Sequence, residues 1–124
     1  MNDVISKMHA EMCKVFSNQY RIQILNQLRH GGLSVGMLAR NLDLPQPLVS
    51  QHMTTLRQKG VVIPHSEGAS TIYEISNPKI IKACDLMREV MIEELERATK
   101  LAKLAKKKRK ETERRGGVGW KTKS

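Results

Sequence analysis

In the first half of the chain, apolar residues recur at steps of three and four, which is the spacing of amphipathic helices. A first helix is predicted over Val4–Phe16, and Asn2 or Asp3 can serve as its N-cap. The pair Ser17-Asn18 interrupts the pattern and can cap a second helix, which Gly31-Gly32 ends. The inward stripe of this second helix is predicted to be Ile22, Leu25 and Leu28.

Two shorter helices with a tight connection are predicted next. Ser34 can cap a third helix that runs to Leu42, where the turn Asp43-Leu44-Pro45 stops it. Gln46-Pro47 then begins a fourth helix, because proline is tolerated at the first helical position, where no backbone N–H is needed. The helix is expected to end at Gly60. Its inward face is predicted to be Val49, Met53 and Leu56.

After the fourth helix the hydrophobic period changes from about 3.6 to 2, which indicates β-strands. Val61 and Ile63 are predicted to share one face of a strand, with Val62 on the other face. Residues 71–75 form a second alternating run, and Ser66-Glu67-Gly68 between the two runs is a turn signal. The segment is therefore predicted to be a β-hairpin rich in β-branched residues.

Asn77-Pro78 ends the hairpin and starts a long predicted helix whose apolar stripe has a mean step of about 3.6 residues. The stripe consists of Ile80, Cys84, Met87, Met91, Leu95, Ala98, Ala102 and Ala105. Because the rest of the chain is small, we expect the helix to bury this stripe against a helix of a second chain.

Three short helices followed by a hairpin are the element order of a winged helix-turn-helix. We predict a mostly α (α+β) fold with a two-stranded wing and a long C-terminal dimerisation helix. With 124 residues, the chain has room for one small domain. We do not predict an enzyme, because the sequence has no Gly-rich phosphate loop, no GxSxG elbow and no His-Glu-x-x-His motif. No cofactor and no metal ligand set is predicted.

Charge is unevenly distributed along the chain. The net charge is +10, yet residues 1–99 hold 11 basic and 10 acidic residues, whereas residues 100–124 hold 11 basic and 2 acidic residues. We therefore predict a near-neutral winged helix-turn-helix domain over 1–99 and a basic, partly helical and then disordered tail over 100–124. The tail is either a solvated extension or an auxiliary arm that binds phosphates.

The location expected from the sequence is the cytoplasm. No apolar run reaches the roughly 18 to 20 residues of a membrane span, and the first ten residues lack the pattern of a signal peptide. Two cysteines, Cys13 and Cys84, are too few for a disulfide-rich secreted framework.

Several segments carry a resemblance to a known family. They are SNQYRIQILNQL, LSVGMLARNLDLPQPLVSQHMTTLRQKGVV, HSEGASTIYEI and ISNPKIIKACDLMREVM. The chain resembles the ArsR/SmtB transcriptional repressors of bacteria and archaea over about residues 8–95, most specifically over 34–62. The resemblance implies a homodimer joined through its first and last helices, with one recognition helix from each subunit in successive major grooves of double-stranded operator DNA.

The face that reads DNA can be predicted from helix rotation. If the inward residues of the fourth helix face the core, a turn of about 100° per residue directs Gln51, Thr54 and Thr55 outward. His52 borders the core stripe and is interpreted as a packed residue. The candidate DNA-binding residues, including two near the wing tip, are Gln46, Ser50, Gln51, Thr54, Thr55, Arg57, His65 and Ser70. The alternative is that these side chains are merely solvated or form the turn.

The sensing chemistry stays open at this point. Members of the family that this chain resembles have metal sites of two types, and the sequence has the ligands of neither. Asn77 and Lys79 occupy the positions of the zinc-type ligands on the last helix, and the predicted third helix has no cysteine for the arsenic or cadmium type. Cys13 and Cys84 are the candidate sensor. They are either packed hydrophobes, a dithiol pair that responds to a thiol-reactive effector, or, with His9, a site for a thiophilic metal.

These features predict a homodimeric, sequence-specific transcriptional repressor that an effector releases from double-stranded DNA. The alternative is a sequence-tolerant architectural nucleic-acid-binding protein in which the basic tail binds and the folded part only dimerises.

Overall fold

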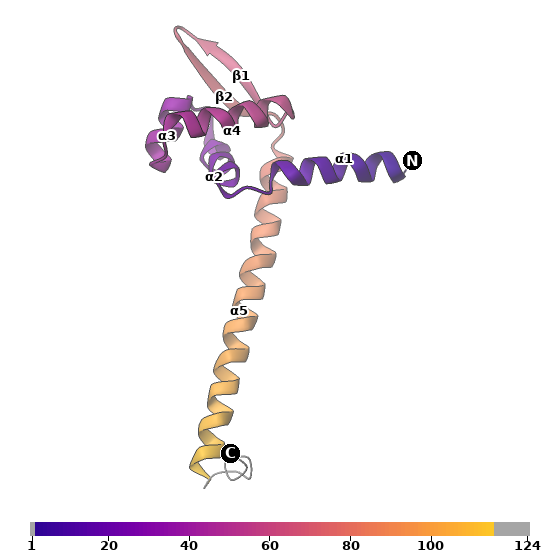
Figure 1. Ribbon diagram of the computed structural model, residues 1–124, viewed down its shortest axis with the longest axis vertical. Coiled ribbons are helices and arrows are strands. Elements are labelled where there is room, and N and C mark those ends of the chain that lie inside the picture. The colour runs from indigo at the N-terminus through magenta and orange to yellow at the C-terminus, as the bar shows by residue number, and fades with distance from the viewer. Residues whose placement is uncertain (1, 116–124) are drawn as a thin grey trace. The chain divides into compact units, whose positions relative to one another are not determined.

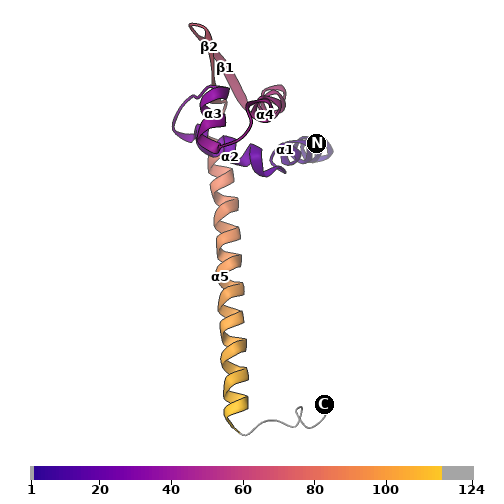
Figure 2. The same ribbon diagram turned by 60° about the vertical axis from the view of Figure 1, so that its left-hand side comes forward.

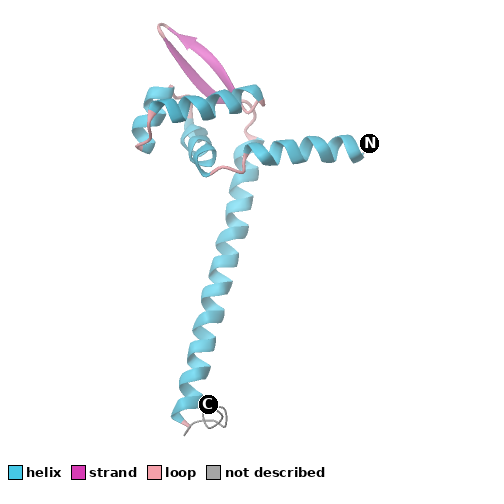
Figure 3. Ribbon diagram, viewed as in Figure 1, coloured by secondary structure: helices cyan, strands magenta, loops and turns pink. Residues whose placement is uncertain are grey.

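Six helical segments and one hairpin make up the computed structural model, which describes residues 2–115 (Figure 1, Figure 3). The elements are α1 (Asn2–Val15), α2 (Gln19–Gln27), a 3-10 turn (Leu28–His30), α3 (Val35–Leu42), α4 (Gln46–Gln58), β1 (Val62–Glu67), β2 (Ser70–Ile75) and α5 (Lys79–Arg114). Of the described residues, 2–83 form one compact unit and 84–115 a second one. The disordered end predicted for the 100–124 tail lies outside the described residues.

Polar caps begin the helices where the sequence predicts them. The Asn18 side chain accepts hydrogen bonds from the backbone N–H groups of Tyr20 and Arg21, at 2.9 and 3.2 Å. The Ser34 hydroxyl accepts one from Met37 N at 3.2 Å and caps α3. Each bond satisfies a backbone donor that has no partner in the first turn of its helix.

Both helices of the helix-turn-helix end in a left-handed residue. Asp43, at φ 54°, ends α3, and the N–H of Leu44 donates to the Ala39 carbonyl at 3.0 Å. Gly60, at φ 73°, ends α4, and Val61 N donates to the carbonyl of Leu56 at 2.9 Å. These 6→1 bonds are the Schellman type of helix end, and they turn the chain sharply without leaving carbonyls unpaired.

The hairpin is antiparallel and runs in register from Val62 opposite Ile75 to Glu67 opposite Ser70. The predicted turn is placed too early, because Ser66 and Glu67 belong to β1 and the two-residue loop is Gly68-Ala69. Gly68 has φ 61° at the first loop position, which suits the turn type that matches strand twist. Within the first unit, the tip of the hairpin extends away from α2, α3 and α4 (Figure 1, Figure 2).

One apolar core joins α2, α3, α4 and the base of the hairpin. Its buried residues are Val15, Ile24, Leu25, Leu28, Leu38, Ala39, Val49, Met53, Leu56, Val61 and Val62. Two predictions of inward residues are wrong. Ile22 is 39% exposed and Ile24 takes its place, while Val61 and Val62 are both buried and Ile63 is 44% exposed. Val61 precedes the strand, so the period of two begins only at Val62.

Helix α5 is 36 residues long and contains no buried residue. It begins as predicted after Asn77, whose side chain accepts a hydrogen bond from Lys79 N at 2.9 Å. Within residues 2–115, no helix combines the length and the apolar content that a membrane span requires.

Candidate nucleic-acid interface

Helix α4 presents one buried face and one exposed polar face. Val49, Met53 and Leu56 are fully buried, as predicted. Among the candidate DNA-binding residues of α4, Thr55 is half-buried and the other five are exposed. These five are Gln46, Ser50, Gln51, Thr54 and Arg57. The buried face therefore packs α4 against the core, and amide, hydroxyl and guanidinium groups on its other face are exposed to solvent.

The exposed side chains of α4 differ in how much of their hydrogen-bonding capacity is already used. Thr54 Oγ1 donates to the Ser50 carbonyl at 3.0 Å, and Thr55 Oγ1 donates to the Gln51 carbonyl at 3.4 Å. Both threonines therefore offer an acceptor oxygen and a methyl group. Within residues 2–115, Gln51 and Arg57 make no side-chain hydrogen bond or ion pair, so all their donors are available to a ligand.

The wing carries two more candidate residues. His65 and Ser70 are both exposed, and His65 Nε2 lies 3.0 Å from Glu74 Oε2 on the neighbouring strand. Sequence reasoning missed this partner, because Glu74 is opposite Ile63 in the register and reaches His65 diagonally. Glu74 thus fixes the direction of the imidazole on this face of the hairpin.

The base of the wing is attached to the segment before α3. Leu33 and Tyr73 exchange two backbone hydrogen bonds, at 3.1 and 2.9 Å. A Cβ atom on Gly32 would overlap Cγ2 of Ile72, so only glycine allows this close approach. The two bonds hold the hairpin against the helix-turn-helix, and a contact of this range could not be read from local periodicity.

Arg21 joins α1, α2 and α4, and sequence reasoning did not single it out. Its Nε donates to the Val15 carbonyl at 2.6 Å, and Nη2 donates to the Lys14 carbonyl at 3.1 Å. Its Nη1 lies 3.4 Å from His52 Nδ1, and the His52 ring packs on Tyr20 with centroids 5.9 Å apart. Burial and then the Arg21 charge lower the pKa of His52. His52 is thus a half-buried ring that packs against Tyr20 and Arg21, and the prediction that it is packed is confirmed.

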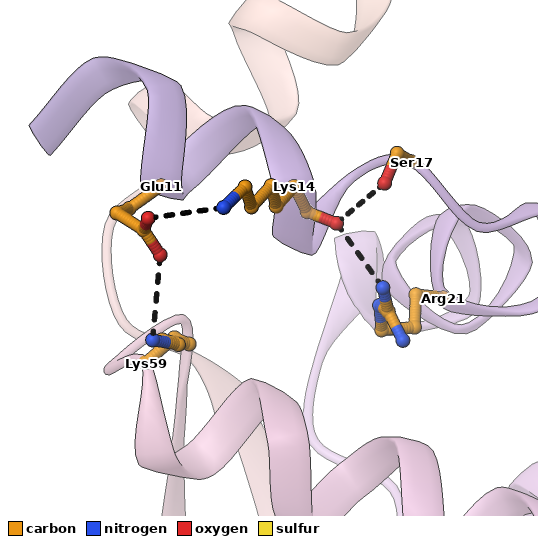
Figure 4. A network of polar contacts seen from close by, with 5 residues as sticks. All are labelled: Glu11, Lys14, Ser17, Arg21 and Lys59. Atoms are coloured by element: carbon orange, nitrogen blue, oxygen red, sulfur yellow. Dashed lines mark hydrogen bonds and ion pairs between the residues drawn. The ribbon is translucent and has the colours of Figure 1, made fainter. Parts of the chain in front are cut away.

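A second set of contacts ties the end of α1 to the end of α4 (Figure 4). The Lys14 carbonyl accepts hydrogen bonds from both Ser17 Oγ, at 2.7 Å, and Arg21. The Glu11 carboxylate lies 3.2 Å from Lys14 Nζ and 4.0 Å from Lys59 Nζ. These ion pairs are exposed and weak, so the buried end of α1 and the Arg21 bonds position the helix.

The candidate sensor residues lie in different units. Cys13 is exposed on α1, Cys84 is half-buried on α5, and the two form no disulfide. His9 is exposed on α1. Within residues 2–115, no three His, Cys, Asp or Glu side chains are grouped so as to hold a metal ion.

Residues 18–63, which span the helix-turn-helix, match the family described as bacterial regulatory protein, arsR family. The transcriptional activator HlyU of Vibrio cholerae is 33% identical over 79 residues, which are 64% of this chain and 73% of that protein. The chain belongs to the arsR family. It is therefore a DNA-binding transcriptional regulator and not an enzyme, as predicted.

Other transcriptional regulators are also similar to this chain in sequence or structure. The transcriptional repressor PagR of Bacillus anthracis is 38% identical over 72 residues, which are 57% of this chain and 72% of that protein. The structure of reduced HlyU from V. cholerae has a TM-score of 0.65 at 31% identity and covers 71% of this chain and 93% of that chain.

A third relative is the homodimeric winged helix-turn-helix DNA-binding domain of a possible ArsR-family regulator from Mycobacterium bovis. Its solution structure has a TM-score of 0.70 at 25% identity and covers 77% of this chain and 88% of that chain. These structures confirm the predicted fold, including the two-stranded wing and the long C-terminal helix.

Proposed function

We propose that this arsR-family regulator is a homodimeric repressor that places α4 of each subunit in the major groove of a palindromic operator. The observation that carries the proposal is the polar face of α4, which is exposed along its length while the opposite face is fully buried. A helix held in this way can enter the groove, because only its polar side chains meet the DNA.

Individual residues on this face suit different DNA groups. Gln51 has a free amide that can pair bidentately with adenine, and the Thr55 methyl can contact the methyl group of thymine. Arg57, near the end of α4, suits a phosphate, as do Gln46 and Ser50 at the start of the helix. The wing residues His65 and Ser70 and the remaining α4 residue, Thr54, are proposed as supporting contacts.

The dimer is proposed from large apolar side chains that lie exposed on α1 and α5 within residues 2–115. Met87, Met91 and Leu95 are 61%, 57% and 68% exposed on α5, and Val4 and Met8 are similarly exposed on α1. Exposed apolar surfaces of this kind mark protein–protein contacts. The related domain from M. bovis is a homodimer, and a second copy of this chain would cover the same helices.

Selection of bound duplexes from a random pool, followed by titration, tests DNA recognition. Replacing Gln51 and Thr55 together by Ala should reduce the preference for the selected duplex by roughly 1 to 3 kcal/mol per lost base contact. Replacing Arg57 by Ala should weaken binding to the selected and to random duplexes alike. If the double variant keeps the preference of the wild type, the proposed recognition face is wrong.

For the effector, we propose thiol chemistry at Cys13 and Cys84. The exposed Cys13 thiol is open to attack, and the two cysteines lie on the two helices that the proposed dimer brings together. Oxidation or capture of a thiophilic metal would change the packing of α1 and α5 and so the spacing of the two recognition helices. The spacing must match about one DNA turn of 34 to 36 Å.

Operator binding by single-cysteine variants tests this proposal. Treatment with a disulfide, a polysulfide or a thiophilic metal should release the wild-type protein from DNA. Cys13→Ser and Cys84→Ser should each abolish the response and leave binding of the reduced protein unchanged. A single variant that still responds like the wild type, or unmodified thiols by mass spectrometry after release, would refute the thiol switch.

A further inference from the structure

The two halves of the segment 84–115, which contains α5 beyond Ala83 and the residue after it, differ sharply in charge. Residues 84–99 carry five acidic and two basic side chains, whereas residues 100–115 carry nine basic and two acidic side chains. The helix nevertheless continues unbroken to Arg114. Because like charges at helical spacing oppose helix formation, so basic a segment calls for an anionic partner.

Five of the basic residues form a single row along the helix. They are Lys100, Lys103, Lys107, Lys110 and Arg114. Their steps of three and four residues keep all five within an arc of about 80° at 100° per residue. Four of them line one shallow groove on the helix surface, together with Lys106 and Glu111. The row is therefore a continuous cationic surface about 21 Å long, at 1.5 Å per residue.

The row lies on the side of α5 away from its apolar stripe. Ala98, Ala102 and Ala105, which continue the stripe, are rotated by roughly 150° from the middle of the row. A partner helix on the stripe would thus leave the row exposed. The cations also have no internal partners, since within residues 2–115 none from Lys100 onward forms an ion pair, whereas Arg97 and Glu94 are paired.

We propose that this row binds the phosphates of duplex DNA without reading sequence, and adds affinity to the operator contacts of α4 and the wing. The inference rests on the proposed function, in which the chain is already held on DNA. A membrane surface suits the segment poorly, because an interfacial helix needs a broad apolar face, and here the stripe continues only as alanine, with Leu101 and Leu104 outside it.

The test uses the full-length chain and a triple variant, Lys103→Gln, Lys107→Gln and Lys110→Gln. Glutamine has nearly the helix propensity of lysine, and circular dichroism checks that the helix is kept. Affinity for the selected duplex and for a random duplex is measured over a range of salt concentrations. Six lost phosphate contacts per dimer would reduce the slope of log K against log salt by up to about 5. We expect both affinities to fall at least tenfold with their ratio unchanged.

The matched control removes the same charge outside the row, by Lys108→Gln and Arg109→Gln on other sides of the helix and Arg115→Gln directly after its end. It should keep most of the wild-type slope. An equal loss in the control would overturn the assignment to the row, as would an unchanged slope in the row variant. Loss of binding to vesicles of anionic phospholipid, with DNA binding intact, would assign the row to membranes instead. If the wild type does not discriminate between the two duplexes, the proposed operator function fails, yet the row variant still tests the row.

Discussion

The core unit and the outer part of α5 use the same hydrophobic period with opposite results. Val49, Met53 and Leu56 recur at steps of four and three residues and are buried inside the chain, whereas Met87, Met91 and Leu95 recur at steps of four residues and stay exposed. The stripe of a helix therefore shows that it has a partner, but not whether the partner belongs to the same chain. In the core unit the short connections bring that partner close, and in α5 no later element follows within the described residues.

The largest effect is expected from truncation inside the core. Leu38→Ala removes a side chain that is 0% exposed, and it should lower the free energy of unfolding by about 2 to 5 kcal/mol, measured by urea denaturation. The matched change on α5 is Leu104→Ala, at a residue 51% exposed and off the stripe, which should cost less than about 0.5 kcal/mol. Similar losses in the free energy of unfolding for both variants would contradict the proposed difference between the core unit and the outer part of α5.

A charge placed in the stripe of α5 should act on association. Met91→Lys is expected to weaken the dimer at least 100-fold, which corresponds to about 2.7 kcal/mol, because a desolvated ammonium group would replace an apolar contact. Leu86→Lys, on another face of α5, serves as the control and should keep the dimer. Sedimentation of both variants over a range of concentrations measures the effect, and an intact Met91→Lys dimer would exclude this stripe from the interface.

The junction between α1 and the core should respond to loss of Arg21. Arg21→Ala leaves the carbonyls of Lys14 and Val15 without their charged donor, and we expect a loss of about 1 to 3 kcal/mol in the free energy of unfolding. Arg40→Ala, at an exposed position on α3, is the comparison and should be nearly neutral. Faster amide exchange confined to the end of α1 would support this role, and equal stability of the two variants would contradict it.

The smallest effect concerns pH. Burial and the Arg21 charge lower the pKa of His52 below its ordinary value of 6.5, so above pH 6.5 the ring is neutral in both the folded and the unfolded chain. As the pH falls through 6.5, the unfolded chain takes up the proton first and the free energy of unfolding decreases. Replacing His52 by Gln should reduce this dependence on pH. Denaturation curves of the wild type and of His52→Gln, recorded between pH 7.5 and 5.5, measure how the free energy of unfolding changes with pH. The same change with pH in both proteins would show that His52 does not contribute.

The helix ends were predictable because their signals are local. Asn18, Ser34, Asp43 and Gly60 each act on backbone groups within a few residues, and each ends or begins a helix where the sequence predicted. The incorrect predictions of core-facing residues occur where local signals do not decide which side of an element is buried. Ile22 and Ile24 both fit an apolar helix face, and only the packing of α2 against α3 and α4 selects Ile24.

The candidate site divides in the same way. The exposure of Gln51 and the burial of Met53 follow from the rotation of one helix, and so they were predictable. The contacts of Arg21 with His52 and of Glu74 with His65 join residues on different elements. Which residues meet in these contacts depends on how the elements pack against one another, and the spacing of residues along the sequence does not determine that packing.

The sequence by itself determined the order of helices and strands, the polar face of α4 and the division of charge along α5, because these depend on residue type and spacing alone. Only the tertiary structure decided that Leu33 pairs with Tyr73 and that Arg21 reaches both the end of α1 and His52 on α4. The physical reason is that such contacts join residues distant in sequence, and their geometry is set by the packing of the whole core.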